Sequence, residues 1–327
     1  MGNFTEIKEE YESKVNSIIN SYLNECRRNG FAPDQNRINQ INNSELMSFR
    51  MTKMMELSKK TGRNTICYFS AWLQGNIASP NPEIMIYDND MNGFMNAVSK
   101  MDKTKGLDLI IHTPGGVVTA AESIVKYLKK MFNSDIRVIV PHLAMSAGTM
   151  IACSSKEIIM GKESSLGPVD PQYHNVPAQG VLKEFERAME ESIKVPNRSL
   201  IWKEIIKQYR PTFLGECENA IRLSEELVRE WLADVMFKKS KNKNSLIDSV
   251  LTELTSHEQS MVHDRHYDYE KCKKIGLKVV RLEDDSELQD KVLSVYHSYL
   301  LSTYFLPTAI KFIEGNNNAS FVINGKR

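Results

Sequence analysis

Two short motifs in this sequence carry the residue types that acyl-transfer chemistry needs, Pro-Gly-Gly at 114–116 and Ser-Ala-Gly at 146–148. A glycine pair can turn backbone N–H groups into a cavity because neither residue requires a negative φ. A serine between a strand and a helix lies where unpaired N–H groups favour developing negative charge. We therefore predict Ser146 as a nucleophile, with the N–H groups of Gly116 and Ala147 as oxyanion donors.

Each motif also has a purely structural interpretation. Ser146 could serve only as a helix cap and the glycine pair only as a turn, and such caps and turns are common. Either motif alone would favour that interpretation. The two motifs together, in this order and separated by one strand-to-helix unit, favour an enzyme site.

The elements that must position these motifs form successive strand-turn-helix units. Apolar, β-rich runs predict strands, and amphipathic segments predict the helices between them. The predicted strands are 65–72, 107–111, 136–141 and 157–161, and the predicted helices between them include 92–101 and 119–132. Such units form an α/β fold with a parallel sheet, and ligands bind at the carboxyl ends of its strands. Both motifs fall at such ends.

Three regions are expected along the chain. They are an N-terminal helical extension (1–60), a catalytic core (61–243) and a C-terminal mixed α/β region that completes the core (244–327). The basic run at 238–243 predicts a solvated loop. After a strand at 277–282 we expect two helices and a loose tail from Gly315.

Residues 88–93 begin like a calcium-binding loop, with Asp88 and Asp90 at its first and third positions. Ser99 stands where such a loop requires a bidentate glutamate, and a strand precedes the segment in place of a helix. We therefore interpret the two aspartates as turn and helix-cap residues.

Composition narrows the function further. The 327 residues include 42 basic and 41 acidic side chains, and this balance gives no indication of a nucleic-acid or membrane partner. The five cysteines form no C-x-x-C pair, which argues for a reducing compartment and against a disulfide framework or a zinc site. The N-terminus lacks a signal pattern, and no apolar stretch is long enough to span a bilayer. We expect a cytoplasmic protein without a metal or cofactor.

Four stretches carry a resemblance to a known family, residues 109–116, 144–149, 160–161 and 166–172. The Pro-Gly-Gly and Ser-Ala-Gly motifs resemble those of the ClpP/crotonase-fold serine peptidases. Gly-Pro-Val-Asp-Pro-Gln, residues 167–172, is similar to the serine dehydrogenase proteinase (SDH proteinase) branch, a relative of the SppA-type peptidases. The resemblance covers roughly residues 60–315 and implies a ClpP/crotonase-like fold with added N-terminal helices and a mixed C-terminal region.

The resemblance also implies which residues activate Ser146. This branch places its triad in the order Ser, Asp, His, which assigns Asp170 as the orienting carboxylate and His263 as the general base. The competing histidines are His257, His266 and His174. Asp170 has a structural alternative as well, because a residue between two prolines can simply fix a turn.

SppA-type peptidases suggest a different base, a lysine paired with the serine. Lys183 and Lys194 stand at suitable places for such a dyad. A lysine acts as a base only where burial lowers its pKa, and Lys194 precedes Val195-Pro196 in an environment that we expect to be apolar. His112, which precedes the Pro-Gly-Gly turn, is expected to line the site.

The leading functional interpretation is an ATP-independent serine peptidase that cleaves peptides or proteins through an acyl-enzyme and assembles as a homo-oligomer. A crotonase-type acyl-CoA enzyme would need a catalytic glutamate near the glycine turn, where only Glu122 is close. An α/β-hydrolase shares the Ser, Asp, His order, but its elbow is Gly-x-Ser-x-Gly. The remaining alternative is a catalytically silent scaffold or partner-activated interaction protein, and the reactivity of Ser146 distinguishes it.

Overall fold

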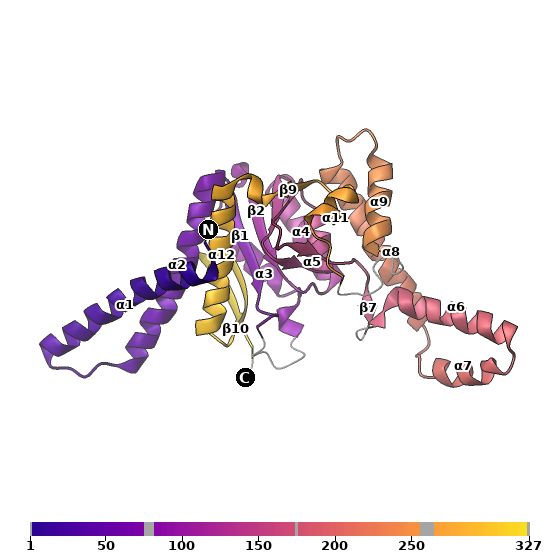
Figure 1. The fold of residues 1–327 in the computed structure, drawn as a ribbon, viewed down its shortest axis with the longest axis horizontal. Coiled ribbons are helices and arrows are strands. Elements are labelled where there is room, and N and C mark those ends of the chain that lie inside the picture. The colour runs from indigo at the N-terminus through magenta and orange to yellow at the C-terminus, as the bar shows by residue number, and fades with distance from the viewer. Residues whose placement is uncertain (1, 75–81, 174–175, 256–264, 326–327) are drawn as a thin grey trace.

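A seven-stranded sheet lies at the centre of the computed structural model, which describes residues 2–74, 82–173, 176–255 and 265–325 (Figure 1). Its strands lie in the order β11-β10-β1-β2-β3-β5-β9. In chain order they are β1 (Asn64–Ser70), β2 (Leu107–His112), β3 (Ile136–Val140), β5 (Ile158–Met160), β9 (Val279–Arg281), β10 (Ala309–Gly315) and β11 (Ala319–Asn324). The five from β1 to β9 are parallel, whereas β10 runs antiparallel to both of its neighbours, β1 and β11. The predicted α/β fold is confirmed.

Helices cover both faces of the sheet. One face packs on α3 (Asp90–Val98), α4 (Val118–Met131), α5 (Ala147–Cys153), α8 (Phe213–Trp231), α9 (Lys243–Thr255) and α11 (Tyr269–Lys274). The other face packs on α2 (Gln35–Thr61) and α12 (Ser286–Phe305). Successive strand residues point to opposite faces: Leu109 and Ile111 contact the first set of helices, and Ile110 contacts the second.

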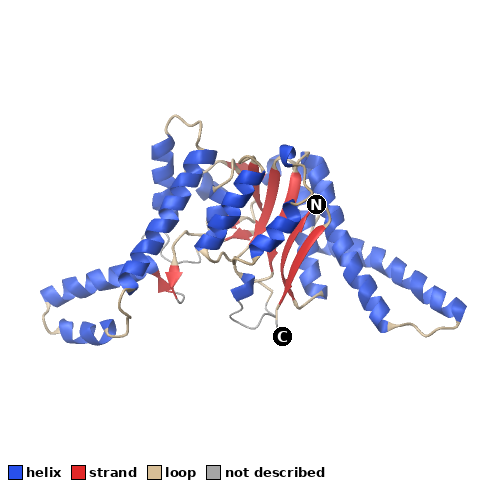
Figure 2. Ribbon diagram, turned by 180° about the vertical axis from the view of Figure 1, so that it is seen from behind, coloured by secondary structure: helices blue, strands red, loops and turns tan. Residues whose placement is uncertain are grey.

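Two helical arms project on opposite sides of the sheet (Figure 2). One consists of α1 (Phe4–Asn29) and the start of α2, and its base packs on α12 through Tyr11, Phe49 and Leu301. The other consists of α6 (Ala178–Lys194) and α7 (Arg198–Ile206). Short strands complete the chain: β4 (Leu143–Ala144) pairs with β6 (Ser165–Leu166), and β7 (Gln172–Tyr173) pairs with β8 (Val176–Pro177).

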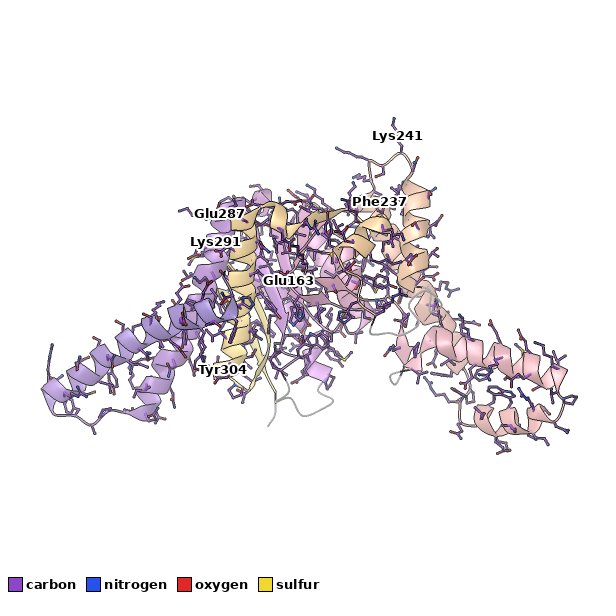
Figure 3. All side chains as sticks on the ribbon, in the orientation of Figure 1. Glu163, Phe237, Lys241, Glu287, Lys291 and Tyr304 are labelled. Atoms are coloured by element: carbon purple, nitrogen blue, oxygen red, sulfur yellow. The ribbon has the colours of Figure 1, made fainter. Side chains whose placement is uncertain are left out.

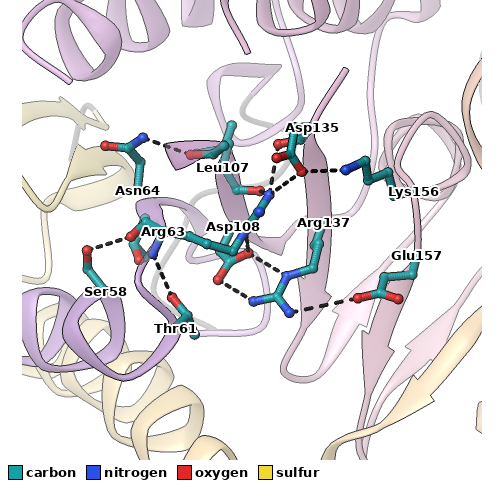
Figure 4. Close-up of polar contacts among 12 residues, drawn as sticks. Ser58, Thr61, Arg63, Asn64, Leu107, Asp108, Asp135, Arg137, Lys156 and Glu157 are labelled. Carbon is teal, nitrogen blue, oxygen red and sulfur yellow. Dashed lines mark hydrogen bonds and ion pairs between the residues drawn. The ribbon is translucent and has the colours of Figure 1, made fainter. Parts of the chain in front are cut away.

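A carboxylate clamp joins the first three parallel strands where they begin (Figure 4). The fully buried Asp108 of β2 accepts hydrogen bonds from Nε of Arg63 and from Nε and Nη2 of Arg137, all at 2.8 Å. Arg63 also donates to Asp135 at 2.9 Å, and Lys156 donates to the same carboxylate at 2.8 Å. Because these residues precede or begin their strands, the clamp fixes the strand starts at the edge opposite to the predicted site.

The C-terminal tail differs from the prediction. One helix, α12, takes the place of the two expected, and the residues expected to be loose form the hairpin β10–β11. Strand β10 is buried along its whole length beside β1 although it carries Lys311 and Glu314. Lys311 pairs with Asp90, and Glu314 pairs with Arg50. Asp90 also accepts the N–H of Tyr87 at 3.1 Å directly before α3, as its predicted role in the turn requires, whereas its ion pair with Lys311 was not predicted.

The region after residue 243 supplies strands to both ends of the sheet, because β9 pairs with β5 and β10 pairs with β1. The three-part division of the chain stays a prediction. The basic run at 238–243 is a loop as far as residue 242, as predicted, and Lys243 begins α9. Lys241 projects from this loop away from the fold (Figure 3). Among the helices of the described residues, none combines the length and the apolar character that crossing a bilayer requires.

Candidate active site

Ser146 occupies a strained junction between β4 and α5. Its φ of 49° and ψ of −116° lie in a region that residues with a β-carbon rarely adopt. The side chain makes no capping hydrogen bond to α5, so the interpretation of Ser146 as a mere helix cap is wrong. A sharp strand-to-helix turn of this kind exposes the hydroxyl of the nucleophilic serine in the α/β-hydrolases.

The Pro-Gly-Gly turn packs directly against this serine. Gly115 has a φ of 98°, and a β-carbon placed on it would lie 2.8 Å from Cβ of Ser146. Gly116 has a φ of 155°, and a β-carbon there would lie 2.4 Å from both N and O of Ile86. Neither position has room for a side chain, and the two predicted motifs therefore meet in space.

Backbone hydrogen bonds hold the turn on one side. The N–H of Ile86 donates to O of Gly115 at 2.8 Å, and the N–H of Val117 donates to O of Ile86 at 2.9 Å. These two bonds engage the carbonyl oxygen of Gly115 and the N–H of Val117, which lie on either side of the Gly116 N–H. Within the described residues, neither this N–H nor that of Ala147, the first residue of α5, donates a hydrogen bond.

The two motifs open onto a cleft of about 550 Å³. Ser146 and Gly116 lie on its wall, and three further segments complete it. The other lining residues are Met85, Pro114, Val117, Val118, Thr119, Pro171, Gln172, Asn219, Ala220 and Leu223. Sequence analysis missed the contributions of Met85 and of α8, because no local pattern marks residues that reach a site only through tertiary packing.

Asp170 lies one residue before the cleft-lining Pro171, and it is only 2 % exposed. The preceding segment is fastened to the serine region by Thr149 of α5. Its Oγ1 lies 2.8 Å from O of Ala144 and 2.9 Å from O of Gly167, and it accepts the Gly167 N–H at 3.0 Å. The structure thus brings the predicted carboxylate to the edge of the cleft in a buried environment.

Three of the predicted base candidates, His263, His257 and His174, lie outside the described residues. The chain on both sides of 256–264 is nevertheless tied to the segment that carries Asp170. Leu166 exchanges two backbone hydrogen bonds with Tyr267, at 2.9 and 2.8 Å, and the N–H of Val169 donates to O of Leu254 at 2.7 Å. The described residues Leu254 and Tyr267 therefore lie against the segment that carries Asp170.

His266 is described, and its side chain is exposed. Burial, and to a lesser degree the nearby His266, lowers the pKa of His142. His142 contacts Tyr296 of α12 through Nδ1 at 3.1 Å. His266 thus lies toward the α12 side and does not line the cleft.

Within a single chain, neither lysine candidate lies next to Ser146. Helix α6 starts next to the cleft, where the N–H of Ala178 donates to O of Pro171 at 2.9 Å. Lys194 ends that helix, about 24 Å further along at 1.5 Å per residue. Its side chain is 72 % exposed and pairs with Glu190, so the predicted apolar environment of Lys194 is wrong.

Lys183 lines a different hollow, which lies between α6, α8 and α9. Charged side chains share this hollow with it, among them Glu225, Arg229 and Asp248.

His112 does not line the cleft, contrary to expectation. Its ring is 1 % exposed on the α12 side of the sheet, where it stacks on His142 at 5.5 Å and contacts Phe69 at 5.1 Å. Burial, assisted by the proximity of His142, lowers the pKa of His112 to about 3. A neutral, fully enclosed imidazole there supports the packing of the sheet.

Comparison with known proteins agrees with this geometry. Residues 38–320 match the family described as ClpP-like SDH-type serine proteinase. The chain is 32 % identical to the uncharacterized protein MJ0137 of Methanocaldococcus jannaschii over 80 % of its own length and 82 % of that protein. It is 33 % identical to the uncharacterized protein MJ1495 of the same organism, over 70 % of its own length and 71 % of that protein.

Proposed function

Because the chain belongs to the ClpP-like SDH-type serine proteinase family, we propose that it is a serine peptidase that cleaves peptide bonds through an acyl-enzyme on Ser146, without ATP. The strained backbone of Ser146 is the observation that carries the proposal. A positive φ at a non-glycine residue costs about 1–3 kcal/mol and persists where function requires it. The φ and ψ of Ser146, 49° and −116°, also lie outside the left-handed helical region in which turn residues such as Thr212 adopt a positive φ.

The geometry supports the following chemistry. Oγ of Ser146 attacks the scissile carbonyl carbon while its proton passes to the base, which then transfers it to the leaving amine. Water attacks the resulting ester and restores the serine. The N–H groups of Gly116 and Ala147 stabilise the oxyanion, and each such donor contributes a factor of about 10²–10³ to the rate.

For the base we propose His263, oriented by Asp170. Two features support this pairing. The carboxylate is buried at the edge of the cleft, and the chain on both sides of 256–264 is hydrogen-bonded to the segment that carries it. His257, His266 and His174 are the competing histidines, and Lys183 and Lys194 would require a second copy of the chain.

Labelling with a fluorophosphonate probe tests the proposal. Wild type is expected to react, Ser146→Ala is not, and Ser123→Ala, which removes an exposed serine of α4, is expected to react normally. His263→Gln and Asp170→Asn should label at least about 100-fold more slowly, since a general base contributes about 10²–10⁴-fold. His266→Gln should label like wild type.

The same experiment separates the catalytic proposal from its alternative. A wild-type protein that never reacts would refute the peptidase and indicate a silent scaffold or a protein that needs a partner. Labelling that survives Ser146→Ala would refute the assignment of the nucleophile. If His263→Gln reacts normally while His266→Gln does not, the base is His266.

We further propose that the protein is a homo-oligomer held together through the α6–α7 arm. Four apolar side chains of this arm are between 63 % and 82 % exposed, Met189, Ile193, Leu200 and Ile201. Exposed apolar groups gathered on one projection are typical of an interface. In light scattering, the double variant Ile193→Glu/Leu200→Glu should dissociate, whereas Lys194→Glu, a charge change on the same arm, should not. An unchanged mass for the double variant would contradict the proposal.

A further inference from the structure

Strand β10 carries a lysine that is enclosed on the face of the sheet that packs on α3. The side chain of Lys311 is 1 % exposed, and its Nζ donates to Oδ1 of Asp90 and to O of Met85, both at 2.7 Å. Asp90 is the first residue of α3 and is itself fully buried. Burying two charges is costly even when they are paired, so this pair calls for an explanation.

The pair continues toward the candidate site through two hydroxyl groups. Tyr68 donates from its hydroxyl to Oδ2 of Asp90 at 2.8 Å. Burial, followed by the Asp90 charge, raises the pKa of Tyr68 well above its ordinary value, and the nearby hydroxyl of Thr113 acts in the opposite direction. Oγ1 of Thr113 accepts the N–H of Gly115 at 3.1 Å. We call these four side chains, Lys311, Asp90, Tyr68 and Thr113, the buried polar chain.

The two ends of the buried polar chain reach the Pro-Gly-Gly turn from different directions. At one end, Thr113 holds the Gly115 N–H. At the other end, Lys311 holds O of Met85, and the next residue, Ile86, binds both O of Gly115 and the N–H of Val117. The turn is therefore fixed on both sides of Gly116, and the only N–H between these contacts is the one that we assign to the oxyanion.

We propose that the buried polar chain positions the Gly115–Gly116 turn so that the Gly116 N–H is preorganised for the oxyanion. This inference rests on the proposed function. The four side chains of the buried polar chain are positioning residues, because they act through the turn and do not line the cleft. A preorganised donor loses its benefit when its position shifts, and a 1 Å displacement can cost a factor of about 10².

The chain offers a matched control on the opposite face of the same strand. Tyr299 of α12 donates to Oε2 of Glu314 at 2.8 Å, and Glu314 is paired with Arg50 through two hydrogen bonds of 2.8 and 2.9 Å. As in the Tyr68–Asp90 contact, a tyrosine hydroxyl here donates to a buried carboxylate that also forms an ion pair. It lies on the α2 and α12 side, away from the turn.

The first test measures the second-order rate of fluorophosphonate labelling at Ser146. Thr113→Val keeps the side-chain shape but removes the acceptor for the Gly115 N–H, and we expect labelling to slow by about 10- to 100-fold. Thr113→Ser restores the hydroxyl and should return the rate to within about threefold of wild type. Tyr68→Phe should slow labelling, whereas Tyr299→Phe should not.

Tyr68→Phe is a better probe than removal of Lys311. Without the lysine, the Asp90 carboxylate is buried with no cation, and such a variant can fail to fold. Tyr68→Phe interrupts the same path while it leaves the ion pair intact. Equal slowing by Tyr68→Phe and Tyr299→Phe would overturn the inference, because it would show a general loss of stability.

The second test does not depend on activity. Hydrogen exchange of a peptide that covers residues 112–118 reports directly on the turn. Thr113→Val and Tyr68→Phe should accelerate its exchange about tenfold or more, and Thr113→Ser and Tyr299→Phe should leave it unchanged. Unchanged exchange in Thr113→Val, or labelling at the wild-type rate in that variant, would overturn the inference while the peptidase proposal stands. If wild type never labels, the peptidase proposal fails and exchange alone decides whether the buried polar chain holds the turn.

Discussion

The buried His112 should make the stability of this protein depend on pH in a way that one substitution removes. Its ring is enclosed by Phe69, Tyr296 and His142 at centroid distances of 5.1, 5.3 and 5.5 Å. Nδ1 accepts the N–H of Leu143 at 3.4 Å, which suits a neutral imidazole that carries its proton on Nε2. Burial lowers the pKa of His112 from 6.5 to about 3.

The direction of this pH dependence follows from proton binding. Between pH 6.5 and about pH 3, His112 is protonated in the unfolded chain but neutral in the folded protein. The free energy of unfolding therefore falls as the pH falls through this window. Each pH unit well inside the window costs about 1.4 kcal/mol. Between pH 7 and pH 5 the loss from this one residue is about 2 kcal/mol.

Urea denaturation at pH 7 and pH 5 measures this loss. In His112→Phe the difference between the two pH values should shrink by about 2 kcal/mol relative to wild type, because phenylalanine cannot take up the proton. Phe69→Leu perturbs the same cluster without removing an ionisable group. It should destabilise the protein equally at both pH values. If wild type and His112→Phe lose the same stability between pH 7 and pH 5, the linkage argument is refuted.

Three further substitutions follow from other contacts. Gly116→Ala places a β-carbon 2.4 Å from the backbone of Ile86 and should slow fluorophosphonate labelling at least about 100-fold; normal labelling would contradict the tight fit. Arg50→Met leaves Glu314 buried without its cation and should lower the free energy of unfolding by about 3–5 kcal/mol, most of which Arg50→Met/Glu314→Gln should recover. Thr149→Val removes a hydroxyl shared by two carbonyl groups, so it should cost about 1–3 kcal/mol in denaturation and slow labelling. An effect on stability alone would show that this threonine does not position the carboxylate segment.

Local patterns were enough to predict that the Pro-Gly-Gly and Ser-Ala-Gly motifs lie at strand ends. Strands β2 and β3 are rich in Leu, Ile and Val, which predicts buried parallel strands. The Pro-Gly-Gly motif follows the carboxyl end of β2, and Ser146 follows β3 after the short strand β4. The Gly-Pro-Val-Asp-Pro-Gln stretch led to the family that the comparison confirmed. Both conclusions depend on residues that are close together in sequence.

The C-terminal hairpin shows why other parts could not be predicted. Lys311 and Glu314 make β10 look like a surface segment, since a strand buried on both faces is ordinarily apolar. Each charge is buried only because a partner more than 200 residues away, Asp90 or Arg50, neutralises it. No pattern within the strand can reveal such a partner.

Lys194 and His112 illustrate the same limit at the site. The neighbouring Val195 and Pro196 suggested an apolar environment for the lysine, but α6 extends away from the cleft and leaves its last residue in solvent. His112 is next to the catalytic turn in sequence, but strand alternation directs its ring to the other face of the sheet.

The sequence by itself determined the places of Ser146 and of the glycine turn at strand ends, the α/β fold and the family, because strand periodicity and turn chemistry are local properties. Tertiary structure alone decided which helices cover each face of the sheet, which buried charges form ion pairs, and how the glycine turn is held. Those outcomes depend on contacts between segments far apart along the chain, and packing and desolvation select among them only once the sheet has formed.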